Sequence, residues 1–133
     1  EESSRGSIAM AKLRHITLST DDLEGTAKFY VDSFGMKIHA QQAHAVRMSD
    51  GVVNLTLIKY RDDDHAGDER GAEFYGIHHI GFEVDDMEEA STQITASGGT
   101  LHGERENEIN VERKFRGPNG VVIDIAKKWQ GTS

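Results

Sequence analysis

The sequence predicts an α+β domain built from two tandem βαβββ modules that share one curled mixed sheet. The first observation is a repeat, because the segments that begin at His15 and at His79 align without a gap at an offset of 64 (79 minus 15). The second is the phrase VRMSDGVV at 46–53, which recurs as FRGPNGVV at 115–122. The third is a change from alternating to helical spacing of apolar residues after each histidine, which indicates a strand followed by a helix.

Length, charge and composition limit the classes of protein. A chain of 133 residues is large enough for one domain and too small for two independent ones, so the modules are expected to share a core. A net charge of -8 argues against binding nucleic acid or an anionic membrane, which requires clustered Lys and Arg. The absence of cysteine excludes disulfides and thiolate metal sites. No apolar stretch reaches the length of a membrane span and no signal-peptide pattern is present, so the cytoplasm is the expected location.

The repeat also divides the chain. The predicted parts are a tail or remnant of cloning at 1–11, module one at 12–60, a linker at 61–75, module two at 76–127 and a C-terminal tail at 128–133. The linker is charged, contains glycine and lacks a period, which is typical of a solvated segment.

Each module is expected to contain one helix and four strands. The motifs DDLE and DDME predict helix starts at which Asp21 and Asp85 accept backbone N–H groups. Gly35 is predicted to end the first helix, and Gly98 or Gly99 the second. The strands that follow the helices are expected at 36–41, 44–49, 52–59, 100–104, 110–116 and 121–127. The SDG and GPNG segments are typical of tight hairpin turns.

One face of the sheet is predicted to be a polar cup around a site. Side chains alternate across a strand, and polar residues are unfavourable in a closed core. The polar residues of this face are Thr17, Ser19, Asn54, Thr56, Glu83 and Asp124. By the same alternation His79 faces the cup, whereas His78 faces the helix and is predicted to be structural.

Two histidines and one acid from this face suggest a metal site. His15 and His79 come from equivalent first strands, and Asp124 lies on the last strand between two apolar residues. Two imidazoles and a carboxylate are a ligand set used by non-haem Fe(II) oxygenases, and Mn²⁺, Zn²⁺, Ni²⁺ and Co²⁺ also fit it. Ordinary strand histidines and a hydrogen-bonded structural acid remain the alternative.

The doubled motifs LRHITLSTDDLEGTAKFYVDSFGM and GPNGVVIDI resemble the vicinal oxygen chelate superfamily, also called the glyoxalase/bleomycin resistance/dioxygenase superfamily. The resemblance covers residues 12 to about 127. It implies that paired βαβββ modules hold a divalent metal which chelates oxygens of a small-molecule substrate. By position it implies the ligands His15, His79 and Asp124, with Thr56 at a fourth ligand place, and a homodimer by analogy.

This sequence departs from the family pattern at Thr56, and this departure ranks the expected reactions. Lactoylglutathione lyases and related isomerases generally carry an acid where this chain has Thr56, so isomerase or lyase chemistry is placed second. Ring-cleaving dioxygenases use two histidines and one acid, so a dioxygenase-type reaction with Fe²⁺ is placed first. A non-catalytic protein that binds a drug or metabolite, as bleomycin-resistance proteins do, is the alternative from another class.

Other residues are candidates for roles in the cup. Thr56 and Glu83 are the predicted catalytic residues. The predicted substrate-binding residues are Arg47, Asn54, Tyr75, Lys114 and Arg116. Arg47 and Arg116 occupy matched places in the repeated phrase, where they would either pair with the acidic helices or bind an anionic group of the substrate. Substrate choice is expected to depend on the loops at 61–75 and 103–110.

Overall fold

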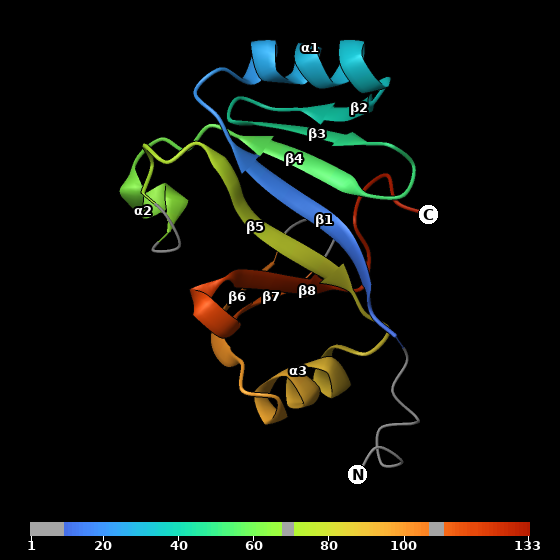
Figure 1. The fold of residues 1–133 in the computed structure, drawn as a ribbon, viewed down its shortest axis with the longest axis vertical. Helices are drawn as coiled ribbons and strands as arrows, with labels where there is room; N and C mark the ends of the chain where they lie inside the picture. The colour runs from blue at the N-terminus through green and yellow to red at the C-terminus, as the bar shows by residue number, and fades with distance from the viewer. Residues whose placement is uncertain (1–9, 68–70, 107–110) are drawn as a thin grey trace.

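The computed structural model describes residues 10–67, 71–106 and 111–133, and Figure 1 shows their fold. The elements in chain order are β1 (Lys12–Ser19), α1 (Leu23–Phe34), β2 (Lys37–Gln41), β3 (Ala45–Ser49), β4 (Asn54–Ile58), α2 (Asp63–Ala66), β5 (Gly76–Glu83), α3 (Met87–Ala96), β6 (Thr100–Glu106), β7 (Val111–Arg116) and β8 (Val122–Ala126). A 3₁₀ turn at Pro118–Gly120 joins β7 to β8. The predicted strands are found within a few residues of their expected bounds.

The strands form one eight-stranded mixed sheet in the order β2-β3-β4-β1-β5-β8-β7-β6. The two first strands, β1 and β5, are antiparallel neighbours at its centre, and each pairs in parallel with the last strand of its own module. Ile16 lies opposite Ile80, its equivalent in the repeat, so a local twofold axis passes near this pair. The predicted α+β fold of two modules in a shared sheet is therefore confirmed.

Two irregularities interrupt the central pairing of β1 with β5. Arg14 is an extra residue between Leu13 and His15, and His78 is an extra residue opposite the step from Thr17 to Leu18. Arg14 and His78 are equivalent in the repeat (78 minus 14 is 64), so the bulge occurs once in each module. A β-bulge redirects a side chain from its alternating position. This feature decides where the His78 ring lies.

The helices cover opposite halves of the sheet, α1 over β3 and β4 and α3 against β6 and β8 (Figure 1). The cluster beneath α1 is built around Met48 and Leu57, which are fully buried. The cluster beneath α3 contains Phe115 and Ile125, each 1% exposed. The expectation of one shared core was wrong, because each helix buries its own half of the sheet and the halves share only the central strands.

Helix caps differ from the prediction by one residue. Asp22 accepts from the backbone N–H of Gly25, and Asp86 accepts from that of Glu89. The second aspartate of each pair is therefore the N-cap, because it directly precedes the first helical residue. Gly35 ends α1 in the left-handed conformation, with φ of 70°, as predicted.

The linker and the C-terminal tail are more ordered than expected. The linker contains the short helix α2, and Ala66 at its end is buried. After β8 the chain crosses to module one, where the C-terminus lies near the turn between β3 and the start of β4 (Figure 1). Trp129 in this segment is 4% exposed, and the hydroxyl of Ser49 donates to the carbonyl oxygen of Gly131 at 2.6 Å. The tail is therefore packed against module one.

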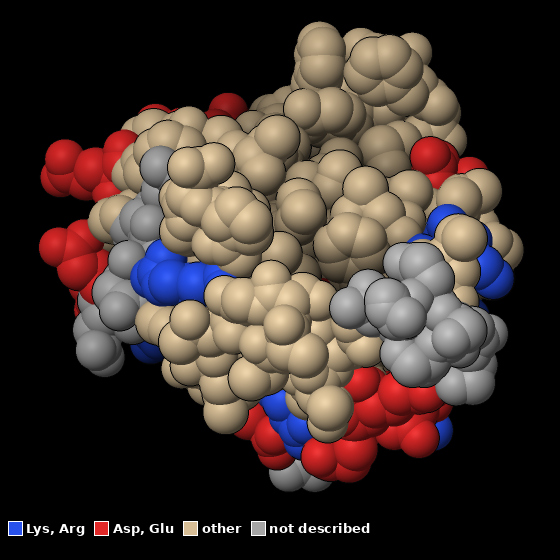
Figure 2. Space-filling model, turned by 60° about the horizontal axis from the view of Figure 1, so that its bottom comes forward, with Lys and Arg blue, Asp and Glu red and all other residues tan. Residues whose placement is uncertain are grey.

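One face of the molecule is charged mainly at its edges. On the face shown in Figure 2, acidic and basic side chains gather around the rim, and uncharged residues occupy the centre. Within the described ranges, the helices are all too short or too polar to cross a membrane.

Candidate metal centre

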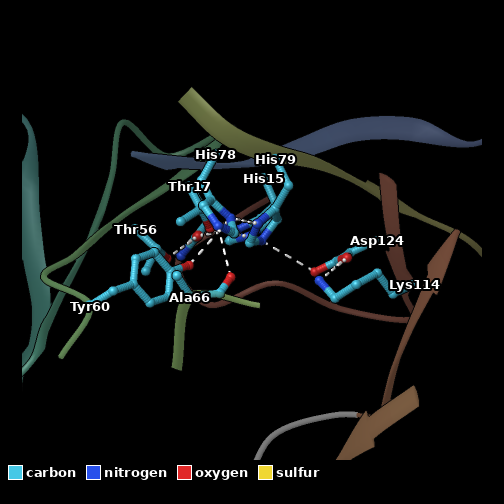
Figure 3. Close-up of polar contacts among 10 residues, drawn as sticks. His15, Thr17, Thr56, Tyr60, Ala66, His78, His79, Lys114 and Asp124 are labelled. Carbon is cyan, nitrogen blue, oxygen red and sulfur yellow. Dashed lines mark hydrogen bonds and ion pairs between the residues drawn. The ribbon is translucent and has the colours of Figure 1, made fainter. Parts of the chain in front are cut away.

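His15, His79 and Asp124 converge in the cup from three adjacent strands (Figure 3). One potential ligand atom from each residue lies within 4.8 Å of the others. All three side chains are buried, and Asp124 is only 1% exposed. The structure thus brings together the three residues that the sequence singled out as metal ligands.

The ring of His15 is oriented by Asn54. The side-chain oxygen of Asn54 lies 2.6 Å from Nδ1 of His15 and accepts a hydrogen bond from the hydroxyl of Thr56. The amide nitrogen of Asn54 donates to the carbonyl oxygen of Gln130, which fixes the orientation of the amide. Because the amide oxygen is an acceptor, Nδ1 of His15 carries the proton and Nε2 keeps its lone pair. The hydroxyl of Thr17, 2.9 Å away, can donate to this Nε2.

The ring of His79 is oriented by its neighbour His78. Nε2 of His78 lies 3.0 Å from the carbonyl oxygen of Ala66, so it carries the proton, and Nδ1 of His78 is then an acceptor. Nδ1 of His79, 2.8 Å away, donates to it, which leaves Nε2 of His79 with a lone pair that faces Asp124. The prediction that His78 faces the helix was wrong, because the bulge in β5 turns its ring toward His79, Tyr60 and α2.

Both candidate imidazoles are held in the neutral form. Burial lowers the pKa of His15 to about 4, and the nearby charges of Lys114 and Arg47 act in the same direction. Burial also holds the pKa of His79 well below its usual range. The positive charge of Lys114 and the interactions with His15 and His78 lower this pKa further. A neutral imidazole is the form that binds a metal.

These shifts predict that the metal-free protein loses stability in mild acid. The pKa of His15 is about 4 when folded and about 6.5 as a model value, so the unfolded chain takes up this proton first as the pH falls. The contribution of neutral His15 to the free energy of unfolding is fully present above about pH 6.5 and is lost as the pH falls toward 4. The loss is on the order of 3 kcal/mol. The lowered pKa of His79 acts in the same direction.

Urea unfolding between pH 7.5 and 4.5 measures how steeply the free energy of unfolding falls with pH. His15→Gln should reduce this slope and the cup-lining His102→Gln should not; equal slopes in all three proteins would contradict the prediction.

Lys114 binds one oxygen of Asp124, and the other oxygen lies beside His79. Nζ of Lys114 donates to Oδ1 at 2.8 Å, and Nε2 of His79 lies 3.3 Å from Oδ2 (Figure 3). Lys114 lies directly across β7 and β8 from Asp124. A buried acid requires a cation or hydrogen-bond donor, and Lys114 supplies both. Because Lys114 holds Oδ1, Oδ2 is the oxygen that could bind a metal.

Trp129 is a site residue that the sequence did not single out. Its indole stacks on the His15 ring, with centroids 3.9 Å apart and an interplanar angle of 4°. A Cβ atom at Gly81 would lie 2.8 Å from the indole and 3.0 Å from the His15 side chain. Gly81 therefore makes room for the stacked pair of rings. The equivalent residue in module one is Thr17, which has a side chain. A lone tryptophan in a predicted tail carried no signal for this contact.

The cup has two connected lobes. The larger lobe is a cavity of about 250 Å³ on the module-two side, and the smaller lobe, about 100 Å³, lies against Trp129 and Asn54. Among the residues that the structure describes, five line both lobes, namely Tyr60, His79, Arg105, Glu112 and Asp124. The sequence missed Arg105 and Glu112. Glu112 shares a strand face with the nominated Lys114, but the position of Arg105 depends on how far β6 extends, and the predicted strand stopped at residue 104.

The remaining nominated residues are not all in the cup. Arg47 and Thr56 line the smaller lobe, although the Thr56 hydroxyl donates to Asn54. Glu83 has a buried oxygen without a hydrogen-bond partner among the described residues, but it lines neither lobe. Tyr75 is half exposed outside both lobes, and Arg116 donates to the carbonyl oxygen of Gly120 at the turn.

The register of the sheet shows that Arg47 and Arg116 are not equivalent positions of the two modules. Arg47 lies opposite Thr56, and Lys114 lies opposite Asp124. Thr56 and Asp124 in turn lie beside Thr17 and Gly81, which are equivalent in the repeat. Lys114 is therefore the spatial counterpart of Arg47. The sequence alignment missed this because the turn phrase and the last strand are out of step by one residue.

The donor set suits a divalent cation. Two imidazole nitrogens with lone pairs and one carboxylate oxygen are ligands for Fe²⁺, Mn²⁺, Zn²⁺, Ni²⁺ or Co²⁺. Ligand atoms at about 2.1 Å from one ion are at most about 4.2 Å apart, so the present spread of up to 4.8 Å requires only a small contraction. The partners of Nδ1 in both rings are the kind of contact that orients metal ligands.

Comparison with known proteins places this site in a family. The family model of the Glyoxalase/Bleomycin resistance protein/Dioxygenase superfamily matches residues 12–125. The chain belongs to this superfamily. The match spans both modules and includes all three converging residues. No curated protein sequence matches the chain.

Several solved structures share the fold. A hypothetical protein from Bacillus halodurans C-125 is 18% identical, with a TM-score of 0.75 over 92% of this chain and 97% of the other. Methylmalonyl-CoA epimerase from Streptomyces coelicolor is 17% identical, with a TM-score of 0.71 over 89% and 97%. The epimerase from Mycobacterium tuberculosis is 19% identical, with a TM-score of 0.69 over 92% and 93%. At these identities the likeness establishes the fold.

Proposed function

We propose that this superfamily member is a metal-dependent enzyme in which His15, His79 and Asp124 hold a divalent cation that binds two neighbouring oxygens of a small substrate. The supporting observation is the orientation of the two imidazoles. Each donates from Nδ1 to a fixed acceptor and keeps a lone pair on Nε2, within 4.8 Å of the other candidate ligand atoms.

The surrounding residues prepare the site. A bound cation would act as a Lewis acid on the chelated oxygens. Asn54 and His78 hold the two rings, and Lys114 holds one oxygen of Asp124. Trp129 covers one face of His15 and keeps water from it. Substrate therefore reaches the centre from the larger lobe.

A dioxygenase-type reaction with Fe²⁺ is the first candidate. Two histidines and one carboxylate with further positions open are typical of non-haem Fe(II) oxygenases. The fourth place is taken by Thr56, whose hydroxyl is bound to Asn54. It supplies no carboxylate for moving a substrate proton, which agrees with an oxygenase.

Proton transfer, as in an isomerase, lyase or epimerase, is the second candidate. Glu112 favours it, because this carboxylate lines both lobes beside His79 and Asp124. It would replace, from module two, the acid that module one lacks at Thr56. The fold shared with methylmalonyl-CoA epimerases is consistent with this reaction.

Elemental analysis of protein purified without chelators tests the proposal. One equivalent of divalent metal per chain is the expected result. Metal-free protein with an intact fold that stays metal-free in iron, manganese, nickel, cobalt or zinc would contradict it. That outcome would favour a non-catalytic binder, in which Lys114 alone balances the charge of Asp124.

Two assays of the metal-loaded protein then separate the reactions. Oxygen uptake with catechols supports the oxygenase, and solvent deuterium incorporation into 2-oxo or hemithioacetal compounds supports proton transfer. Glu112→Gln should lower deuterium incorporation by about 100-fold or more, the usual contribution of a general base, and should spare oxygen uptake.

A further inference from the structure

We propose that the substrate carries a carboxylate, which Arg105 binds in the larger lobe while the substrate's neighbouring oxygens face His79 and Asp124. This inference rests on the proposed function and adds the chemical class of the substrate. It also assigns a recognition role to a residue that the sequence did not nominate.

Arg105 is placed and available for this role. It comes from β6 and lines both lobes. Glu112 lies directly opposite Arg105 across β6 and β7, but among the described residues no ion pair of Arg105 with an acid is found. Arg113, the residue after Glu112, binds both Glu88 and Glu104. The chain has 23 acidic and 15 basic side chains, so partners for a surface arginine are plentiful. Arg105 is exposed and lines the cavity, and a guanidinium at the wall of a cavity is suited to an anionic ligand.

The charges that line the lobes support an anion. Three basic residues, Arg47, Arg105 and Lys114, line the two lobes. Among the described lining acids, Asp124 is paired with Lys114 and Glu104 with Arg113. With Glu112 as the remaining lining acid, Arg47 and Arg105 give the lobes a positive balance before the charge of any cation is added. A cavity with such a balance attracts negative ligands although the whole chain is acidic.

The size and shape of the cavity favour a small acid. The larger lobe, about 250 Å³, is below the range of about 300–1,000 Å³ that is usual for drug-sized ligands. Trp129 limits the smaller lobe, so a long ligand cannot extend past His15. The planar donors of Arg105 match the two oxygens of a carboxylate.

Binding of matched acid and ester pairs tests this inference. Titration calorimetry would compare 3,4-dihydroxybenzoate with its methyl ester and pyruvate with methyl pyruvate, using the metal-loaded and the metal-free full chain. Each pair keeps its neighbouring oxygens and differs in the carboxylate. In the wild type at least one acid should bind about tenfold or more tightly than its ester. Arg105→Met should reduce that ratio to about threefold or less, and Arg105→Lys should restore part of it.

Arg116→Met is the matched control, since it removes the same charge at the turn outside both lobes and should leave the ratio unchanged. Metal content should be equal in all these proteins. The inference is wrong if no acid binds more tightly than its ester, or if Arg105→Met keeps the wild-type ratio. Failure of the wild type to bind metal would refute the proposed enzyme instead, and the ratio in metal-free protein would then decide whether the carboxylate pocket exists.

Discussion

Replacing His79 with alanine is expected to remove stoichiometric metal from the protein and to lower its metal affinity by more than about 100-fold. Loss of even an outer partner of a metal ligand typically costs about 10–100-fold, and His79 would be a ligand itself. The variant would also leave His78 without its hydrogen-bond partner at 2.8 Å and Asp124 without the nitrogen at 3.3 Å. Elemental analysis and competition with a chromophoric chelator measure the change.

The matched control is His102→Ala. His102 lines the larger lobe but is exposed and is not one of the three converging residues. It should keep one equivalent of metal. Equal metal content in the two variants would show that the cation binds elsewhere and would remove His79 from the proposed site. Circular dichroism of both variants checks that the fold is intact.

Replacing Trp129 with alanine should lower the free energy of unfolding by about 3–5 kcal/mol, the usual cost of truncating a buried large aromatic side chain. The indole is 4% exposed and fills the space between His15 and Gly81. Its loss would leave a cavity beside a neutral imidazole and weaken the docking of the C-terminal segment. Urea unfolding followed by circular dichroism measures the effect.

Trp129→Phe separates stacking from size. A phenyl ring can still cover the His15 ring, so this variant should lose about half as much stability or less, in line with the smaller volume removed. An alanine variant as stable as the wild type would mean that the tail is not packed against module one in solution. The predicted C-terminal tail would then be the correct description.

Much of the fold followed from the repeat. The gapless alignment of the two histidine segments placed the strands and helices, and the SDG and GPNG turns placed the hairpins. Alternation along regular strands also placed His15, His79 and Asp124 on one face, and the structure brings these side chains together. These features depend on local periods, which a single sequence displays.

The missed features depend on contacts or irregularities without a period. His78 was assigned to the wrong face because a bulge is not visible in the alternation of side chains. The stacking of Trp129 on His15 joins residues 114 positions apart (129 minus 15) and depends on the space left by Gly81. The counterpart of Arg47 was misassigned because a one-residue difference beside a turn changes the register.

The local twofold axis near Ile16 and Ile80 bears on how the chain diverged. A duplicated ancestor would have carried the same side chain at both members of each related pair. In this chain one related pair consists of Thr17 and Gly81. A second related pair consists of Thr56 and Asp124. The two halves of the sheet therefore carry different side chains at related positions, and Gly81 leaves the space beside His15 that the Trp129 indole occupies.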